Sequence, residues 1–440
     1  MNLAHALRLP LTSEEKMPAI AFVGAGGKTK AMFQLARELP PPVILTTTTH
    51  LGAWQTSLAD AHTLAQTPDE LKNFVPRGVT LVTGSIAGER ALGLSDETLT
   101  WLREFCQNSN LPLLIEADGA RQLPLKAPAA HEPAIPAFVD LVIQVAGLSG
   151  LGKPLKEAAF RPEQFAQLSG TTSETPVTPD ALTRVLNHPD GGLKNIPTRA
   201  RRAALLNQAD SPNLQAAAQS IAQKLLPAYQ AALTTSLKDE LVHAVREPIA
   251  GIVLAAGEAT RFGQPKQLLD WRGEPFVRKV ARTALQAGLW PVVVVTGAFA
   301  ADVESALAGL SLTVRHNPHW QAGQASSIRT GLEAIASSTG GVIFLLADQP
   351  QIMPTLLQSL TEEHARTLAP VIAPLVIDRR GNPVLFDRVT FPDLMALEGD
   401  VGGRGVFLKH RIRYLPWHDD ALLLDVDTPE DYAHLKEALA

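Results

Sequence analysis

The strongest constraint on the fold of this chain is the repeated alternation of short apolar runs with stretches of helical spacing. Each run has the length of a buried strand and is bounded by glycine or by polar turn residues. Such alternation is typical of mostly parallel α/β sheets. The runs are AIAFVG (19–24), PVILTT (42–47), VTLVTG (79–84), LPLLIEADG (111–119) and DLVIQVAG (140–147) in the first half, and GIVLAAG (251–257), PVVVVTG (291–297), GGVIFLLAD (340–348) and APVIAPLV (369–376) in the second.

The length of 440 residues predicts two domains, because one ordinary core does not extend over such a chain. Residues 219–248 carry helical spacing and then polar residues that end at Pro248, immediately before a new apolar run. We therefore expect a boundary within residues 235–248, with one domain over 1–240 and the other over 248–440. The predicted class is α/β, and each domain is expected to be a mostly parallel sheet flanked by helices.

Composition limits the partners and the compartment. The chain has 39 Lys and Arg against 44 Asp and Glu, so its net charge of -5 gives no general attraction to a nucleic-acid backbone. The single cysteine, Cys106, excludes an intramolecular disulfide and a cysteine-clustered metal site. No segment has the roughly 20 apolar residues that a membrane span needs, and the N-terminus lacks the apolar core of a signal peptide. We expect a cytoplasmic protein without nucleic-acid or membrane partners.

A glycine loop follows the strand GIVLAA in the second half. Small residues there let the backbone approach a nucleotide closely, so that its N–H groups can line phosphate oxygens. Cationic side chains would add the charge that a triphosphate needs, whereas an isolated AAG would be only a tight turn. The expected nucleotide-binding residues are Leu254, Ala255, Ala256 and Gly257, with Arg261 and Lys266 as the catalytic cations.

Carboxylates predict a metal site for the same half. Asp348 follows GGVIFLLA at the expected carboxyl end of a strand, where ligands bind in open α/β sheets. Asp425 and Asp427 precede the last helix. Mg²⁺ usually takes one or two carboxylates plus substrate phosphates, so we expect Asp348 and one of the other two to bind it. Each aspartate taken alone would more often cap a helix or a turn.

The second half resembles the MobA-like nucleotidyltransferases, and within them the molybdenum cofactor cytidylyltransferases. The matching stretches, in chain order, are LAAGEATRFGQPKQLL, GQASSIRTG, LLADQP, RGNP, GDVGGRG and DVDTPED, and they extend over residues 249–437. Gly402-Gly403-Arg404 replaces the more frequent Gly-Ala-Arg. The resemblance implies a Rossmann-like nucleotidyltransferase fold.

The resemblance also implies roles. The LAAG loop and Lys266 hold the triphosphate, Ser326 and Ser327 lie near the base, and Asp348 binds Mg²⁺ as catalytic carboxylate. Ala256 favours CTP over GTP, because guanylyl relatives typically carry LAGG. The acceptor would be the phosphate of a molybdopterin-type cofactor. That group is already ionised near neutral pH, so no protein nucleophile is required, and positioning and charge neutralisation should carry the rate.

A second glycine loop, in AIAFVGAGGKTKAMFQLA, predicts a P-loop-like phosphate site in the first half. Its expected ligand-binding residues are Gly24, Gly26, Gly27, Lys28 and Thr29. Phe22 and Val23 occupy the region in which the full GxxxxGK[ST] spacing requires its first glycine. A glycine turn with a capping threonine is the alternative.

Weaker signals accompany that loop. Glu116 and Asp118 end a strand-like run and suit a metal-side or water-side acid, and residues 207–210, NQAD, faintly resemble a base-reading NKxD motif. The motifs GAGGKT, TTTTH, EADGARQLPLKAPAAHEP, LSGLGKPL, FRPEQF, GGLKNIP and LLNQAD resemble the YqeC family over roughly residues 15–230. The resemblance implies maturation of a molybdenum hydroxylase, with its apoenzyme as a partner. His131 and Glu132 lie in the family signature, and a surface turn is an equally good interpretation of them.

The sequence leaves two alternative functions open. One is a guanylyltransferase or another small-molecule nucleotidyltransferase, against which Ala256 argues only modestly. The other is a nucleotide-regulated chaperone whose N-terminal half hydrolyses ATP or GTP while it delivers cofactor to an apoenzyme. Arg261, Lys266 and Asp348 together favour catalysis over a degenerate binding module.

Overall fold

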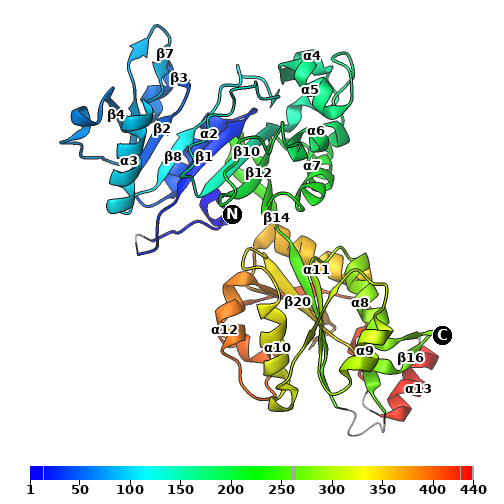
Figure 1. Cartoon of the computed structure of the whole chain (residues 1–440). Helices are drawn as coiled ribbons and strands as arrows, with labels where there is room; N and C mark the ends of the chain where they lie inside the picture. The colour runs from blue at the N-terminus through cyan, green and yellow to red at the C-terminus, as the bar shows by residue number, and fades with distance from the viewer. Residues whose placement is uncertain (13, 259–263, 427, 439–440) are drawn as a thin grey trace. The chain divides into compact units, whose positions relative to one another are not determined.

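The chain folds into two compact units, Met1–Arg246 and Glu247–Ala440, and each is described by itself. The computed structural model describes all residues except 13, 259–263, 427 and 439–440 (Figure 1). The described part contains no helix that is both long enough and apolar enough to cross a lipid bilayer.

The first unit is built on a nine-stranded sheet, counted over the described residues. Its spatial order is β14-β13-β12-β10-β1-β8-β2-β5-β4, and every neighbouring pair is parallel except β13 with β14. The strands are β1 (Ala19–Gly24), β2 (Val43–Thr47), β4 (Ala61–Leu64), β5 (Val79–Thr83), β8 (Leu113–Glu116), β10 (Leu141–Gly147), β12 (Arg201–Asn207), β13 (Ala231–Ser236) and β14 (Leu241–Arg246).

Helices and short strands complete this unit. Two small sheets form from β3 (His50–Gly52), β6 (Ile86–Ala87) and β7 (Arg90–Leu92), and from β9 (Leu125–Lys126) and β11 (Ala159–Phe160). The helices are α1 (Leu3–Ala6), α2 (Lys28–Glu38), α3 (Asp96–Asn108), α4 (Leu155–Ala158), α5 (Pro162–Ser169), α6 (Pro179–Asn187) and α7 (Pro212–Leu225).

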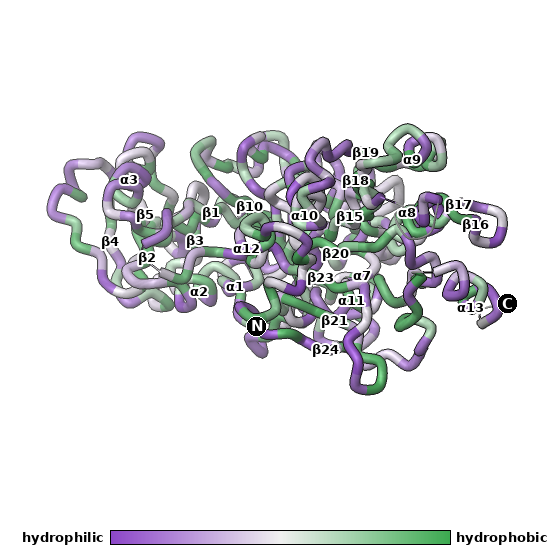
Figure 2. The backbone as a smooth tube through the Cα atoms, turned by 90° about the horizontal axis from the view of Figure 1, so that it is seen from below, coloured by the Kyte–Doolittle hydropathy of each residue, from purple (hydrophilic) through white to green (hydrophobic). Residues whose placement is uncertain are grey.

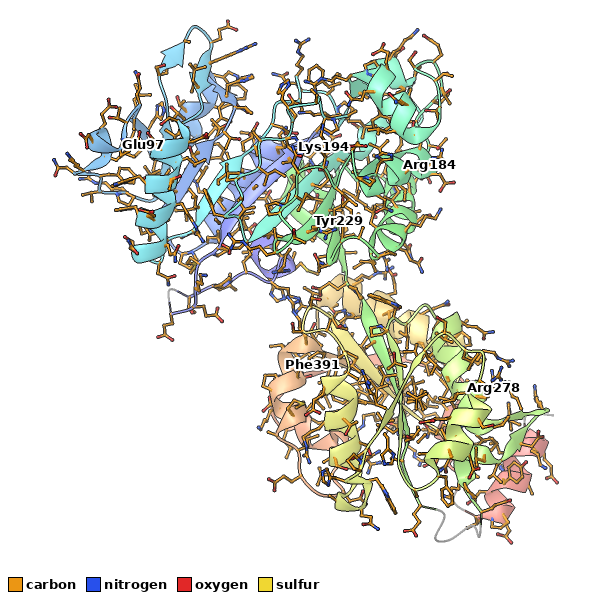
Figure 3. The ribbon with its side chains drawn as sticks, in the orientation of Figure 1. Glu97, Arg184, Lys194, Tyr229, Arg278 and Phe391 are labelled. Carbon is orange, nitrogen blue, oxygen red and sulfur yellow. The ribbon has the colours of Figure 1, made fainter. Side chains whose placement is uncertain are left out.

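The large sheet of the first unit has apolar cores that involve different helices. The core that contains α3 includes Leu99, Leu102 and Cys106, and another core collects residues of α5, α6 and α7. Tyr229 is 1% exposed in the latter core, and its hydroxyl donates to the Leu186 carbonyl at 2.7 Å (Figure 3). That hydrogen bond satisfies a polar atom that burial would otherwise leave unpaired.

The second unit contains a mixed sheet ordered β19-β18-β15-β20-β23-β21-β22, with β24 paired to β21. The strands β18, β15 and β20 are parallel neighbours, whereas β23 runs antiparallel to β20 and β21. The strands are β15 (Ile249–Ala255), β18 (Val292–Thr296), β19 (Thr313–His316), β20 (Gly341–Leu346), β21 (Val371–Val376), β22 (Arg379–Arg380), β23 (Val384–Asp387) and β24 (Ile412–Pro416), and β16 (Asp270–Trp271) and β17 (Glu274–Pro275) form a separate hairpin.

Helices cover both faces of this sheet. Successive residues of β15 point to opposite sides, so Val253 packs with α8, α9 and α11, and Ile252 packs with α10 and α12. The alternation explains why β15 and β20 are apolar along their length, as their hydrophobic colouring in Figure 2 shows. The helices are α8 (Phe276–Gln286), α9 (Ala300–Ala306), α10 (Gln324–Glu333), α11 (Pro354–Thr367), α12 (Phe391–Met395) and α13 (Pro429–Ala438).

The predicted fold class is confirmed: both units are α/β, and the neighbouring strands of their sheets are mostly parallel. All nine apolar runs named from the sequence form strands. The polar connection expected before Pro248 is wrong in one respect, because residues 231–246 form the antiparallel pair β13 and β14. The strand β13 is buried along its whole length, but two threonines and a serine form its second half in place of the aliphatic side chains that made the other strands recognisable.

Candidate functional site

The carboxyl ends of β15 and β20 bring the glycine loop at residues 254–257 and Asp348 together. The two strands are parallel neighbours with Leu254 opposite Leu346, so the residues that follow each strand lie at the same edge of the sheet. The Ala347 N–H also donates to the Leu254 carbonyl at 3.3 Å. This edge is the place where ligands bind in open α/β folds.

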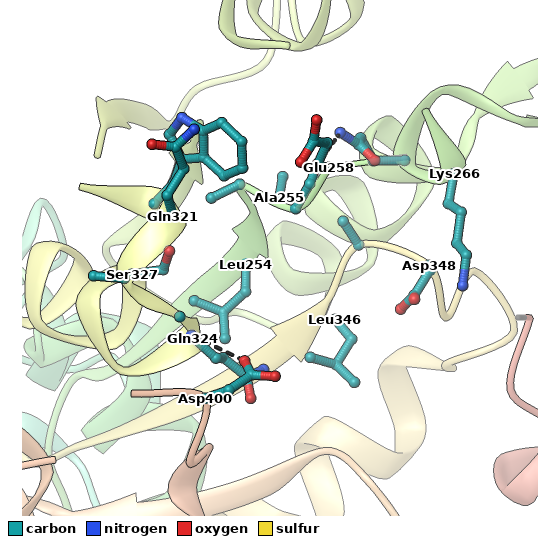
Figure 4. A pocket seen from close by; sticks show the side chains of 17 residues that line it. Leu254, Ala255, Glu258, Lys266, Gln321, Gln324, Ser327, Leu346, Asp348 and Asp400 are labelled. Atoms are coloured by element: carbon teal, nitrogen blue, oxygen red, sulfur yellow. Dashed lines mark hydrogen bonds between the residues drawn. The ribbon is translucent and has the colours of Figure 1, made fainter. Parts of the chain in front are cut away.

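A cavity of about 900 Å³ opens at this edge (Figure 4). Leu254, Ala255, Ala256, Gly257, Lys266, Ser327 and Asp348 all border it, as the sequence predicted for a nucleotide site. Arg261 lies outside the described residues, and so does Asp427. The other bordering residues, which no sequence motif had indicated as site residues, are Glu258, Gln267, Trp320, Gln321, Ala322, Gly323, Gln324, Leu346, Ala347 and Asp400.

The two serines expected near the base differ in position. Ser327 borders the cavity, whereas Ser326 is not among the bordering residues. The Ser326 hydroxyl donates to the His319 carbonyl at 2.9 Å and to the Gly323 carbonyl at 2.8 Å. It therefore stabilises the backbone at the start of α10. Asn317, which is 1% exposed, donates from its side-chain nitrogen to both hydroxyls. The geometry assigns a structural environment to Ser326 and leaves Ser327 facing the cavity.

Asp400 anchors the start of α10 to the same cavity. Its Oδ1 accepts a hydrogen bond from the Gln324 backbone N–H at 3.2 Å, and this bond is drawn as a dashed line in Figure 4. A carboxylate at a helix N-terminus is favoured because the first N–H groups lack partners within the helix. The motif GDVGGRG, noted in the sequence, is thereby placed beside this cavity.

The residues around Asp348 fit a magnesium ion held jointly with phosphates. Within the described ranges, no three His, Cys, Asp or Glu side chains cluster as in a metal site made by protein alone. Mg²⁺ usually needs only one or two carboxylates beside substrate phosphates, and Asp348 borders the cavity. Asp425 does not border it, but its Oδ1 accepts from the side-chain nitrogen of Gln349, the neighbour of Asp348, at 2.8 Å.

A second cavity of about 360 Å³ adjoins the first. The two share Leu254, Gln324, Leu346 and Asp400 as bordering residues. The second cavity is also bordered by Asn382 and Arg404, from motifs noted in the sequence, and by Phe344, Phe386 and Phe407. The Arg380 guanidinium lies 4.1 Å from the centre of the Phe407 ring. Cationic groups beside aromatic rings suit an anionic ligand that carries a flat heterocycle.

The glycine loop of the first unit follows β1 and leads into α2. Gly24, Gly26 and Gly27 have φ angles of 93°, 82° and 125°, which L side chains rarely adopt. Lys28 is 5% exposed, and its Nζ donates to the Gly24 carbonyl at 2.8 Å and lies 3.2 Å from Asp118 Oδ1. Burial lowers the pKa of Lys28, but the charges of Asp118 and Glu116 outweigh it and raise that pKa.

Glu116 and Asp118 both contact this loop. The Thr29 hydroxyl donates to Glu116 Oε2 at 2.7 Å, and the Gly24 N–H donates to Asp118 Oδ2 at 3.0 Å. Burial raises the pKa of Glu116. A cavity of about 810 Å³ is bordered by Gly26 to Lys30, by Glu116 and by Gln208. The tertiary structure therefore joins the loop, the strand-end acids and part of the NQAD segment.

Glu132 serves as an ion-pair partner in this unit. Its carboxylate lies 2.7 Å from Lys126 Nζ and 2.7 Å from an Arg161 nitrogen. Burial opposes its ionisation, but the hydrogen bonds from Arg161 and Lys126 prevail and lower its pKa to about 2. His131 is exposed. The signature residue Glu132 thus has a defined contact, which the sequence alone did not reveal.

The profile of the MobA-like NTP transferase domain matches residues 251–429, and that of the YqeC protein matches residues 20–163. Protein YqeC of Escherichia coli is 33% identical over 46% of this chain and 80% of its own length. Nicotine blue oxidoreductase of Paenarthrobacter nicotinovorans is 32% identical over 42% of this chain and 96% of its own length. A probable molybdenum cofactor guanylyltransferase of Bacillus cereus is 25% identical over 43% of this chain and 97% of its own length. The chain belongs to the YqeC family through its N-terminal half and to the MobA-like NTP transferase family through its C-terminal half, and it is a nucleotidyltransferase that carries a YqeC domain.

Proposed function

We propose that the C-terminal unit transfers a cytidylyl group from CTP to the phosphate of a molybdopterin-type cofactor and releases pyrophosphate. The observation that carries this proposal is the convergence of the Gly257 loop, Lys266, Asp348 and Ser327 on one cavity. The adjoining aromatic and cationic cavity supplies room for a second substrate.

The reaction needs charge neutralisation more than it needs a protein nucleophile. An oxygen of the acceptor phosphate attacks the α-phosphorus of CTP, a new P–O bond forms, and the bond to the bridging oxygen breaks to release pyrophosphate. Lys266 and Arg261 are proposed to balance negative charge on the triphosphate, and Asp348 would hold Mg²⁺. Bound Mg²⁺ supplies further positive charge at the phosphates.

The cavity of about 360 Å³ is the proposed acceptor site. Arg404 would attract the acceptor phosphate, and Asn382 offers both hydrogen-bond donors and an acceptor to a heterocycle. Because Leu254, Gln324, Leu346 and Asp400 border both cavities, an acceptor placed there lies next to the triphosphate. Adjacent sites of this kind reduce the entropic cost of bringing the two substrates together.

The choice of CTP rests on Ala256. This residue borders the cavity and is 6% exposed, and a Cβ added to Gly297 would lie 2.9 Å from its methyl group. Gly297 therefore gives Ala256 the space that it occupies. A guanylyl transfer is the second candidate, because one relative is named a probable molybdenum cofactor guanylyltransferase.

We also propose that the N-terminal unit binds a phosphorylated ligand through Gly24 to Thr29, and that it serves the maturation of a molybdenum hydroxylase. The loop opens α2 and borders a cavity of about 810 Å³, so its N–H groups can converge on an anion. Thr29 is already paired with Glu116, an arrangement that suits a hydroxyl and a carboxylate sharing Mg²⁺.

Pyrophosphate release is the decisive measurement for the C-terminal unit. The full chain is incubated with Mg²⁺, molybdopterin cofactor and CTP, GTP, ATP or UTP in turn, and the nucleotide adduct is identified by mass spectrometry. Pyrophosphate and a cytidylylated cofactor are expected with CTP. If pyrophosphate is released with every nucleotide but no cofactor adduct forms, the proposed acceptor is rejected. A guanylylated cofactor would favour the second candidate.

A further inference from the structure

Four strand ends of the first unit meet beside the phosphate loop. The strands β1, β10, β12 and β13 are parallel neighbours, so Gly24, Gly147, Asn207 and Ser236 all lie at the carboxyl edge of the sheet. A Cβ added to Gly147 would lie 3.0 Å from the Gly26 Cα and would collide with the side chain of Gln208. The ends of β10 and β12 are therefore packed directly against the loop.

Asn207 ties the loop to the end of β13. Its side-chain nitrogen donates to the Gly26 carbonyl at 2.7 Å. Its side-chain oxygen accepts from the Leu237 N–H at 3.0 Å and from the Thr235 hydroxyl at 3.2 Å. Asn207 is 4% exposed, so this amide is a buried and satisfied link between three segments. A ligand held by the loop is thereby placed in a fixed position relative to the residues that follow β12 and β13.

A carboxylate stands just beyond this link. Asp210 follows Asn207 by three residues, and its side chain is 30% exposed. Lys238 contacts Asp210 with a nitrogen-to-oxygen distance of 2.9 Å. Hydrogen bonds from Lys238 and from Ser236 lower the pKa of Asp210, so this carboxyl is ionised at neutral pH. Gln208, between Asn207 and Asp210, borders the cavity that contains the loop.

We propose that the phosphorylated ligand of the N-terminal unit is a guanine nucleotide, whose phosphates bind Gly24 to Thr29 and whose base is read by Asp210. The inference rests on the phosphate site proposed above. It adds the base, which neither the family nor the relatives assign.

The choice of guanine follows from hydrogen-bond chemistry. Guanine presents two donors side by side, the ring N1–H and the exocyclic amino group, and an ionised carboxylate can accept both. Adenine and cytosine present a ring nitrogen lone pair next to their amino groups, and this lone pair would repel the carboxylate. Xanthine has a carbonyl oxygen where guanine has the amino group, so it matches an amide that both accepts and donates.

The ion pair between Asp210 and Lys238 does not block this role. Lys238 is 61% exposed, and exposed ion pairs contribute little to stability, so a base can replace the ammonium at a small cost. The lysine stem would then be available to lie over the face of the base.

The test exchanges aspartate for asparagine and guanine for xanthine. Calorimetric titrations with Mg²⁺ compare GDP, XDP, ADP and CDP on the full chain, on Asp210→Asn and on Lys28→Ala. The matched control is Asp239→Asn, which changes an exposed aspartate next to Lys238. A carboxylate pairing with two donors should favour GDP over XDP by roughly 10- to 100-fold. Asp210→Asn should reverse that order, Asp239→Asn should preserve it, and Lys28→Ala should weaken both ligands.

The outcomes separate the two proposals. Guanine recognition is overturned if binding depends on Lys28 but the affinities for GDP, ADP and CDP are equal. It is also overturned if Asp210→Asn leaves the relative affinities for GDP and XDP unchanged. In both cases the proposed phosphate site remains supported. If no nucleotide binds in a manner that depends on Lys28, both proposals for this unit fail. Asp210→Asn and Lys28→Ala should not change nucleotide binding to the C-terminal unit. Binding there therefore cannot produce the expected reversal in the order of GDP and XDP.

Discussion

The side-chain nitrogen of Asn317 donates a hydrogen bond to the hydroxyl of Ser327 at 3.0 Å. Asn317 follows β19, whereas Ser327 belongs to α10, so the bond joins two segments at the wall of the cavity proposed to bind the nucleotide. The Asn317 side-chain oxygen accepts from the His319 N–H at 2.9 Å, which fixes the orientation of the amide. Ser327 is therefore held in place before any ligand enters.

Ser327→Ala is expected to raise the KM for the nucleotide by roughly 2- to 10-fold, because one hydrogen bond to a neutral partner contributes about 0.5–1.5 kcal/mol. The turnover number should change less. Steady-state kinetics with Thr330→Ala as the control tests this, since the Thr330 hydroxyl donates to the Ser326 carbonyl within α10 and does not border the cavity. Equal kinetic effects of the two substitutions would remove Ser327 from nucleotide binding.

Lys266→Ala and Asp348→Ala are each expected to lower nucleotide transfer by about 10²- to 10³-fold. The loss of one preorganised charge contact in the transition state costs roughly 3–4 kcal/mol. Pyrophosphate release is measured beside Lys409→Ala and Asp378→Ala, which change exposed residues of the same unit. Circular dichroism must show that every variant is folded. Near-normal turnover in a folded Lys266 or Asp348 variant would exclude that residue from the site.

CTP is expected to outcompete GTP when both are present at equal concentration. Ala256 borders the cavity, and its methyl group should limit how closely a purine can approach the backbone. The ratio of cytidylylated to guanylylated cofactor in one reaction measures this preference. Ala256→Gly should shift the ratio toward GTP, and a wild-type excess of the guanylylated product would contradict the prediction.

The free energy of unfolding of the N-terminal unit is expected to decrease as the pH is lowered, because Glu132 becomes protonated. Its pKa is lowered from 4.5 to about 2 in the folded state, so its stabilising contribution is present above pH 4.5 and is lost as the pH falls toward 2. At neutral pH, Glu132→Gln should cost about 1.5–3 kcal/mol, the usual range for hydrogen bonds to charged groups.

Urea unfolding at several pH values measures that cost, with the hydrogen exchange of peptides from residues 113–163 as the signal that reports the unfolding of this unit. The difference between wild type and Glu132→Gln should shrink between pH 4.5 and pH 2. Glu174→Gln is the control, because Glu174 forms an exposed ion pair with Lys156. A difference that stays constant over this range would mean that the pairs with Lys126 and Arg161 do not stabilise the unit.

Nine strands of the two large sheets could be predicted from the sequence, because burial on two faces leaves an uninterrupted apolar run. This held for β1, β10, β15 and β20, and it placed Gly24, Gly257 and Asp348 at strand ends. It failed for β13 and β14, because β13 ends in the polar residues 234–236 and the polar residues 238–240 lie between the two strands. Local composition therefore determined which segments become strands only where both faces are covered by apolar side chains.

The contacts that complete the sites were decided by the tertiary structure. The separation of two residues along the chain does not reveal whether their side chains are in contact, because strand order and crossover connections determine which side chains meet. Asn207 reaches Gly26 across 181 residues, and Gln349 reaches Asp425 across 76. The sequence by itself determined the two α/β units, the glycine loops and the acids at strand ends. Only the packing of parallel strands brought Thr29 to Glu116, because such contacts depend on how the elements are arranged in space.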